Sequence, residues 1–331
     1  MRRRLFVIGN GFDLHFGLPT KVSDFKDYLS YQNVYSMGNA REVYDSYGVN
    51  WSEFEKSLAS ISIDCIYEEN AQGPDYLSDR ESDRDGGIIE MVELTDQFLE
   101  ARNNALNEMI NNTESKIQSI QSPYRKSLFN DSIIISFNYT STLETLFDLQ
   151  HSEVYHIHGY FPNQDKLIFG YKKEERSLLE TNATIYSKFE EEIYKISHDS
   201  KLSDNEKELK RDEIKFLYED GYYDYYLDQQ REVVNSFYKS NKKTFRYDEL
   251  KAFLADYVEQ SIDEVVVLGQ SMAEVDSEYM EIIEGVIKPK RWIISQFEGQ
   301  PDKLDLKNYT FNKKISFCTI DDFAKDKINK K

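Results

Sequence analysis

The chain has 331 residues, of which 40% are hydrophobic and 14% aromatic, enough to build the core of a large domain. Its 60 acidic and 41 basic residues give a net charge of −19, which disfavours nucleic acid as a main partner. Its two cysteines, Cys65 and Cys318, match no zinc-binding spacing, and no apolar run is long enough to span a membrane. We therefore expect a cytoplasmic protein with reduced thiols, no zinc module and no membrane contact.

Short apolar runs bounded by turn residues predict buried β-strands along the chain. These runs are Arg4–Ile8, Ser132–Phe137, Glu153–His158, Lys166–Phe169, Glu264–Leu268, Arg291–Ser295 and Lys314–Cys318. Helical patterns separate most of them. Strands that alternate with helices predict an α/β, Rossmann-like fold with a mostly parallel sheet and helices on both faces.

The predicted helices begin with Val22–Leu29, directly after the first glycine turn. Ser52 and Glu55 have the spacing of a capping box before a helix that ends at Ile61. Longer helical patterns cover Ile88–Ile120 and Ala273–Ile287. The polar stretch Tyr67–Gly87 is predicted to be an exposed loop, and Lys172–Gln260 carries charges at helical spacing without a strand pattern.

These patterns predict one domain over residues 1–331. Its core segments are 1–60, 131–171 and 261–331, and helical insertions occupy 61–130 and 172–260. We expect the second insertion to provide a surface for a partner protein or for self-association.

Four polar or glycine-containing motifs follow predicted strands, where ligands bind in open α/β sheets. They are Gly9-Asn10-Gly11-Phe12-Asp13, Asn138-Tyr139-Thr140, His156-Ile157-His158-Gly159 and Gly269-Gln270-Ser271. Each motif alone also has a purely structural interpretation, as a tight turn or a hydrogen-bonded histidine. The first lacks the third glycine of the dinucleotide-binding fingerprint, because Leu14 occupies that position.

The order of these motifs resembles the AbiH family of phage abortive-infection proteins. The resemblance rests on GNGFDLHFGLPT at 9–20, WSEFE at 51–55, SFNYTSTLE at 136–144, HIHG at 156–159, LIFG at 167–170 and LGQSMAEVD at 268–276. The same motifs are more loosely similar to the sirtuin-like NAD-binding fold. The family resemblance implies an effector of phage defence.

The sirtuin-like resemblance implies that the strand-end motifs bind NAD as a substrate. We expect no prosthetic group and no metal, because two distant cysteines cannot build the four-cysteine zinc module of sirtuin deacetylases. In that fold the first glycine loop holds the pyrophosphate, a covering loop follows it, and an asparagine and a histidine flank the nicotinamide ribose. The catalytic residues it implies are Asn138 and His158. The nucleotide-binding residues it implies are Gly9, Asn10, Gly11, Phe12, Asp13, Pro19, Thr20, Thr140, Gly269 and Ser271. Thr140 stands where the sirtuin-like pattern usually has an aspartate.

We expect hydrolysis of the bond between nicotinamide and ribose, which passes through an oxocarbenium-like transition state. The amide oxygen of Asn138 would orient water, and neutral His158 would accept a proton. Such an enzyme would be toxic if always active, which implies a phage-derived trigger or partner protein. We also expect a homo-oligomer.

Two alternatives remain open at the level of sequence. A non-catalytic nucleotide-binding sensor or scaffold would bind the same ligand without turning it over. A metal-dependent phosphoesterase would use the pairs Asp13/His15 and His156/His158, and strand alternation predicts that the second pair shares one face.

Overall fold

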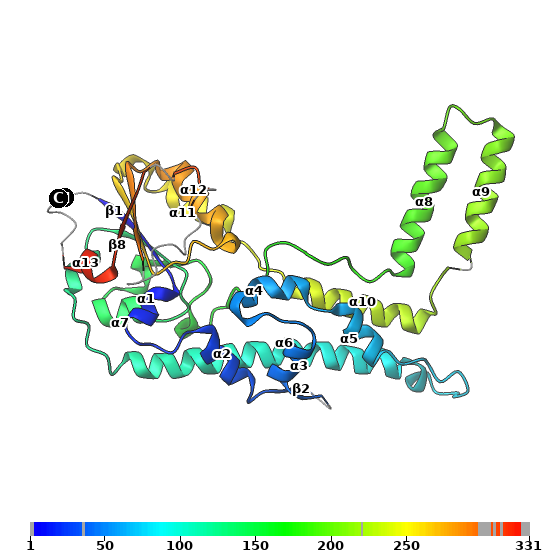
Figure 1. Ribbon diagram of the computed structural model, residues 1–331, viewed down its shortest axis with the longest axis horizontal. Coiled ribbons are helices and arrows are strands. Elements are labelled where there is room, and N and C mark those ends of the chain that lie inside the picture. Colours follow the sequence, from blue (N-terminus) through cyan, green and yellow to red (C-terminus); the bar gives the residue numbers. More distant parts are fainter. Residues whose placement is uncertain are drawn as a thin grey trace.

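The computed structural model describes residues 3–34, 37–219, 221–296, 306, 309–311 and 314–325. Its central sheet contains six parallel strands in the order β5-β4-β1-β6-β7-β8 (Figure 1). The strands are β1 (Arg4–Ile8), β4 (Ile133–Ser136), β5 (Val154–His156), β6 (Glu264–Leu268), β7 (Arg291–Ser295) and β8 (Ile315–Cys318). This is the strand order of Rossmann folds. The predicted fold class is therefore confirmed.

The strands β1, β4, β6 and β7 are buried on both faces of the sheet, which explains why they are short continuous apolar runs. Leu5 and Val7 of β1 pack on one face, and Phe6 and Ile8 pack on the other. Helices α11 (Tyr247–Ala255) and α12 (Ser277–Ile287) cover the first face. Helices α1 (Asn10–His15), α7 (Thr142–Phe147) and α13 (Ile320–Ala324) cover the second.

A separate helical body packs beside the carboxyl edge of the sheet (Figure 1). It contains α2 (Val22–Leu29), α3 (Ala40–Ser46), α4 (Phe54–Ser57), α5 (Ile63–Asn70), α6 (Glu81–Ile117), α10 (Tyr225–Ser240) and the hairpin of β2 (Asn33–Val34) and β3 (Gly38–Asn39). Helix α6 joins the two parts, because Phe98 packs in the helical body and Ile117 packs against the sheet.

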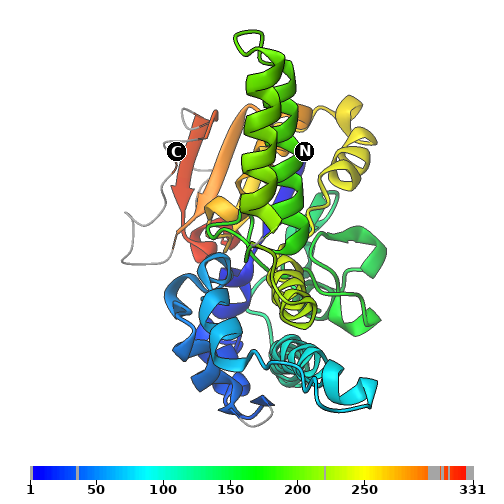
Figure 2. The ribbon, with the colours of Figure 1, turned by 90° about the vertical axis from the view of Figure 1, so that its right-hand side faces the viewer.

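Helices α8 (Asn182–His198) and α9 (Asp204–Glu219) form a hairpin that projects away from the rest of the molecule (Figures 1 and 2). Neither helix contributes a side chain to the three buried hydrophobic clusters formed by the described residues. Short 3-10 helices complete the described structure: Trp51–Glu53, Leu58–Ser60, Lys126–Phe129, His151–Glu153, Phe161–Asn163, Val258–Gln260 and Glu274–Asp276. No helix among the described residues has the length and apolar character needed to cross a membrane.

Three local predictions were wrong. Lys166–Phe169 is not a strand, and Ile168 instead forms single hydrogen bonds with the His158 carbonyl and the Tyr139 hydroxyl. The predicted loop Tyr67–Gly87 is shorter at both ends. Helix α5 continues to Asn70, and α6 already begins at Glu81 and buries Gly87 against Gln230. Ser52 and Glu55 form no capping box, since the side chain of Asn50 caps this turn.

Candidate functional site

A cleft of about 1270 Å³ lies between the carboxyl edge of the sheet and the helical body. Loops after β1, β4, β5 and β6 form one wall, and residues of α2, α4 and α6 form the other. The cleft opens beside the point where β1 is flanked by β4 and β6, which is where Rossmann folds bind nucleotides. Its walls include the aromatic side chains of Phe25, Phe54, Phe137, Tyr139 and Phe169.

The structure brings seven of the twelve predicted site residues to this cleft. The lining residues are Asn10, Asp13, Thr20, Asn138, Thr140, His158 and Ser271. The other five, Gly9, Gly11, Phe12, Pro19 and Gly269, are not among its lining residues. Phe12 is fully buried in the cluster between the sheet and α7.

The glycines after β1 and β6 allow the two loops to approach each other closely. A Cβ on Gly11 would lie 2.7 Å from the Gly269 carbonyl oxygen, and a Cβ on Gly9 would lie 2.5 Å from Gln270 Cα. The N–H groups of Gly11 and Phe12 donate to the carbonyls of Gly269 and Gly9, respectively. These glycines therefore have a packing role between strands, in addition to any role toward a ligand.

Three buried polar atoms of cleft-lining residues have no hydrogen-bond partner among the described residues. They are Asp13 Oδ1, Thr20 Oγ1 and His158 Nε2. A buried polar group without a partner costs roughly 1–3 kcal/mol, so such atoms are rare unless a ligand or water satisfies them. Their convergence on one cleft indicates a binding site.

The carboxyl group of Asp13 is held next to the loop after β4. Thr140 Oγ1 donates to Asp13 Oδ2 over 2.7 Å, and Asn138 Nδ2 donates to the Gly9 carbonyl over 3.2 Å. Burial raises the pKa of Asp13 to about 6, although Thr140, Thr142 and Asn138 favour its ionised form. Asp13 is therefore a hydrogen-bond acceptor that ionises just below neutral pH.

A cluster of charged side chains lies around His158. His158 Nε2 is 3.5 Å from Asp276 Oδ1, which is 2.9 Å from the ammonium group of Lys243. Glu55 Oε2 lies 3.4 Å from the same ammonium group. The side chain of Lys243 is only 1% exposed, whereas that of Glu55 is 29% exposed.

The electrostatic balance of this cluster follows from burial and pairing. Burial raises the pKa of Glu55, and Lys243 opposes that rise. Burial alone would raise the pKa of Asp276, but Lys243 and His158 hold it well below its ordinary value. For Lys243, burial lowers the pKa and the two carboxylates raise it above its ordinary value overall. The cluster therefore keeps Asp276 ionised beside His158.

Glu55, Lys243 and Asp276 were not among the predicted site residues. Glu55 and Asp276 lie inside the motifs WSEFE and LGQSMAEVD, so a signal for them was present in the sequence. Lys243 lies in a charge-rich segment and had no such signal. It reaches the cleft because the chain after α10 pairs with Tyr171, whose main chain bonds to Asn241 and Lys243.

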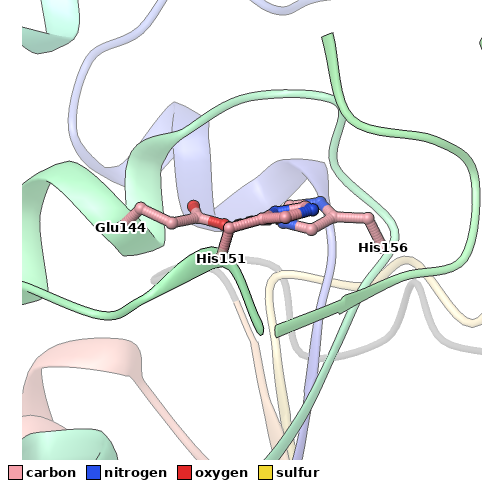
Figure 3. A group of neighbouring side chains, drawn as sticks. All are labelled: Glu144, His151 and His156. Carbon is pink, nitrogen blue, oxygen red and sulfur yellow. Dashed lines mark hydrogen bonds and ion pairs between the residues drawn. The ribbon is translucent and has the colours of Figure 1, made fainter. Parts of the chain in front are cut away.

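His156, the last residue of β5, and His158 contact different parts of the protein. The prediction that they share one face was therefore wrong. Strand β5 ends at His156, and the chain turns before His158. His156 lies 2.8 Å from Glu144 of α7, whereas His158 packs against Phe137 and Tyr279 near Asp276. Figure 3 shows His156 with Glu144 and His151.

The residue pairs of the phosphoesterase alternative are also separated. Asp13 lines the cleft, whereas His15 bonds to Tyr124 Oη over 2.5 Å. Among the described residues, the group with metal-ligating geometry consists of Glu144, His151 and His156. It contains neither Asp13 nor His158.

A comparison with known protein families matches residues 5–296 to the family described as bacteriophage abortive infection AbiH. Searches of curated proteins and of solved structures found no match. The matched range contains the strands from β1 to β7 except for Arg4, and it contains the helical body. It also contains every cleft-lining residue except Tyr309 and Thr310. The chain therefore belongs to the AbiH family of bacteriophage abortive-infection proteins.

Proposed function

We propose that this abortive-infection protein hydrolyses NAD at the bond between nicotinamide and ribose. The observation that carries the proposal is a set of three buried atoms without a hydrogen-bond partner among the described residues. They are Asp13 Oδ1, Thr20 Oγ1 and His158 Nε2, the last of which faces Asp276 at 3.5 Å, and they lie in a cleft at the nucleotide-binding edge of a Rossmann-like sheet. Aromatic rings and hydrogen-bonding groups together suit a ligand that has flat bases and hydroxylated sugars.

Asp13 supports the recognition of a ribose. Its Oδ1 is the unpartnered atom, and a ribose hydroxyl would donate to it. Thr140 occupies the position of the aspartate in the sirtuin-like pattern, but its hydroxyl donates to Asp13, so α1 supplies a carboxylate beside that position. The departure at Thr140 is therefore compatible with a complete ribose site.

Asn138 and His158 have the chemistry that the cleavage needs. The Nδ2 of Asn138 donates to the Gly9 carbonyl, so its amide oxygen is the atom that would orient the attacking water. His158 would accept the proton from this water. The imidazolium that forms would be stabilised by Asp276, which is 3.5 Å away and held ionised by Lys243. The leaving nicotinamide is cationic before cleavage and needs no protonation.

The proposal is tested by incubating purified protein with NAD and measuring the release of nicotinamide. We expect His158→Gln and Asn138→Ala to reduce turnover by about 10²–10⁴-fold, the usual contribution of a positioned acid–base group. His198→Gln, on the exposed surface of α8, is the matched control and should keep full activity. Circular dichroism spectra should show that all three variants are folded.

Two results would replace this proposal with one of the alternatives. Tight NAD binding by calorimetry without nicotinamide release, in the presence of a phage lysate as well, would favour the sensor or scaffold. Hydrolysis of bis-p-nitrophenyl phosphate with no release of nicotinamide from NAD would favour the phosphoesterase.

A further inference from the structure

A second group of side chains outside the cleft has the composition of a transition-metal site. Glu144 of α7, His151 of the following 3-10 helix and His156 of β5 each direct one ligand atom toward the others, all within 4.8 Å (Figure 3). None of the three lines the cleft. The mechanism proposed above does not use them.

The hydrogen bonding of His156 requires a cation at this position. Its Nδ1 is 3.1 Å from the Asn138 carbonyl oxygen, which only accepts, so Nδ1 carries the hydrogen. Its Nε2 then points a lone pair at Glu144 Oε1, which is 2.8 Å away and is also an acceptor. Two acceptors at this distance need a second proton or a metal ion between them. A metal-binding histidine typically donates its other N–H to a carbonyl or carboxylate, as His156 does.

The remaining atoms of the group favour the metal ion. Glu144 Oε2 is buried and has no hydrogen-bond partner within the described part of the chain, so it is available as a further ligand atom. His151 Nδ1 lies 3.8 Å from Glu144 Oε1. Zinc bonds to nitrogen and oxygen at about 2.0–2.1 Å, and a tetrahedral arrangement therefore separates its ligand atoms by about 3.4 Å. The distances of 2.8 and 3.8 Å bracket this value.

One side-chain amide must adopt a particular orientation. His151 Nε2 is 3.0 Å from the Asn163 amide. Binding of a metal at Nδ1 places the hydrogen on Nε2, so Asn163 must present its oxygen there. This is a rotation by 180° that exchanges two atoms of similar size and moves nothing else.

We propose that Glu144, His151 and His156 bind a Zn²⁺ ion, with water completing the coordination. Two imidazoles and one carboxylate are a common zinc donor set. Mg²⁺ and Ca²⁺ prefer oxygen ligands and are not expected to bind. The side chain of His151 is 46% exposed and gives the ion access from solvent.

The position of the site indicates a role in organising the cleft. His156 bonds to the carbonyl of Asn138, and Glu144 lies on the helix that begins just after Thr140. Bound zinc would join α7, β5 and the loop that carries both Asn138 and Thr140. The ion would therefore fix the position of this wall of the cleft without contacting the nucleotide.

Zinc binding is tested on the purified full chain, without NAD, so its result is independent of the proposed hydrolysis. After removal of metals and dialysis against ZnSO₄, we expect about one zinc per chain by atomic emission and a melting temperature a few degrees higher. CoCl₂ should give the intense visible absorption of tetrahedral Co²⁺. MgCl₂ should change neither the melting temperature nor the spectrum.

Substitutions of the ligands identify the site. His151→Gln, Glu144→Gln and His156→Gln should each weaken zinc binding by more than about 100-fold, because even groups that only orient a ligand cost about 10–100-fold when lost. His198→Gln removes an exposed histidine elsewhere and should bind zinc normally. His151 is half exposed, so its variant reports on the ion even if a buried variant misfolds. If protein dialysed against ZnSO₄ takes up no zinc and its melting temperature does not change, the proposal is overturned. Full zinc binding by His151→Gln would overturn it too. In either case a protonated His156 would account for the contact with Glu144.

Discussion

Asp13 is a buried carboxyl group whose ionisation opposes folding. Its pKa is raised by burial from 3.8 to about 6, which corresponds to roughly 3 kcal/mol at most. Because the folded protein holds this proton more tightly than the unfolded chain, the contribution of Asp13 to stability is greatest below pH 4. This contribution is lost as the pH rises through 6 and does not change above that. Asp13→Asn should therefore stabilise the protein by up to about 3 kcal/mol at pH 7, with little effect at pH 4.

The same substitution should weaken the site, because an amide at position 13 loses the charged acceptor for a ribose hydroxyl. We expect NAD to bind about 10–100-fold more weakly, because this is the change in affinity that the loss of a hydrogen bond to a charged group usually causes. Thermal unfolding from pH 4 to 8 and calorimetric titration with NAD measure the two effects. Asp248→Asn, whose side chain is 93% exposed, should change neither. Unchanged affinity in the stabilised Asp13 variant would remove Asp13 from the ribose site.

The sequence motifs predicted where individual cleft residues lie, but they did not predict which distant side chains pair with one another. Asn138 and His158 follow buried strands, so their place at the carboxyl edge could be predicted from local pattern alone. Lys243 pairs with Glu55 and Asp276, from which it is separated by 188 and 33 residues. Such contacts depend on how distant segments pack, and a single sequence carries no pattern for them.

The loops after β1 and β6 are in close backbone contact at Gly269, which has a φ of +71°. A Cβ at this position would lie 2.0 Å from the main-chain nitrogen of Phe12. Gly269→Ala should destabilise the protein by about 2–5 kcal/mol, because it combines a left-handed backbone with a clash against backbone. Urea unfolding followed by circular dichroism measures this loss.

Gly285→Ala is the matched control for Gly269→Ala. Gly285 lies in α12, where an added Cβ would meet no atom of the described residues within 4 Å. Gly285→Ala should stabilise the protein by about 0.5–1 kcal/mol, because alanine loses less backbone freedom in a helix. Equal effects of the two alanine substitutions on stability would show that the two loops are not in close contact at Gly269.

Strands and helices could be predicted from the sequence where burial produces a simple pattern of apolar residues. Strands β1 and β6 are apolar runs because helices cover both faces of the sheet. Lys166–Phe169 has a similar pattern for another reason, since Leu167 and Phe169 pack onto the helical body. The start of α6 was missed because Gly86 and Gly87 resemble a helix end, whereas Gly87 is required for close contact with Gln230.

At the scale of the molecule, the α8–α9 hairpin is an appendage on a fold that is complete without it. Its ends are adjacent, because the Asn182 amide bonds to both the N–H and the carbonyl of Tyr223. Replacement of residues 186–219 by a short Gly–Ser linker should therefore preserve the fold. We expect the melting temperature to change by less than about 4 °C, the change that roughly 1 kcal/mol produces in a domain of this size class.

The hairpin should matter for defence even though the fold does not need it. It exposes Tyr194, Leu209 and Phe216 at 64%, 66% and 68% of their surface, and we expect these side chains to contact another protein. In cells challenged with phage, the shortened protein should lose protection, while the purified protein should still release nicotinamide from NAD. Leu209→Ser with Phe216→Ser in the full-length chain should give the same separation, because it removes the apolar surface and leaves the hairpin in place. Full protection from phage by both variants would rule out this hairpin as the surface for a trigger or partner protein. Loss of cooperative unfolding in the shortened protein would show that the hairpin is part of the fold.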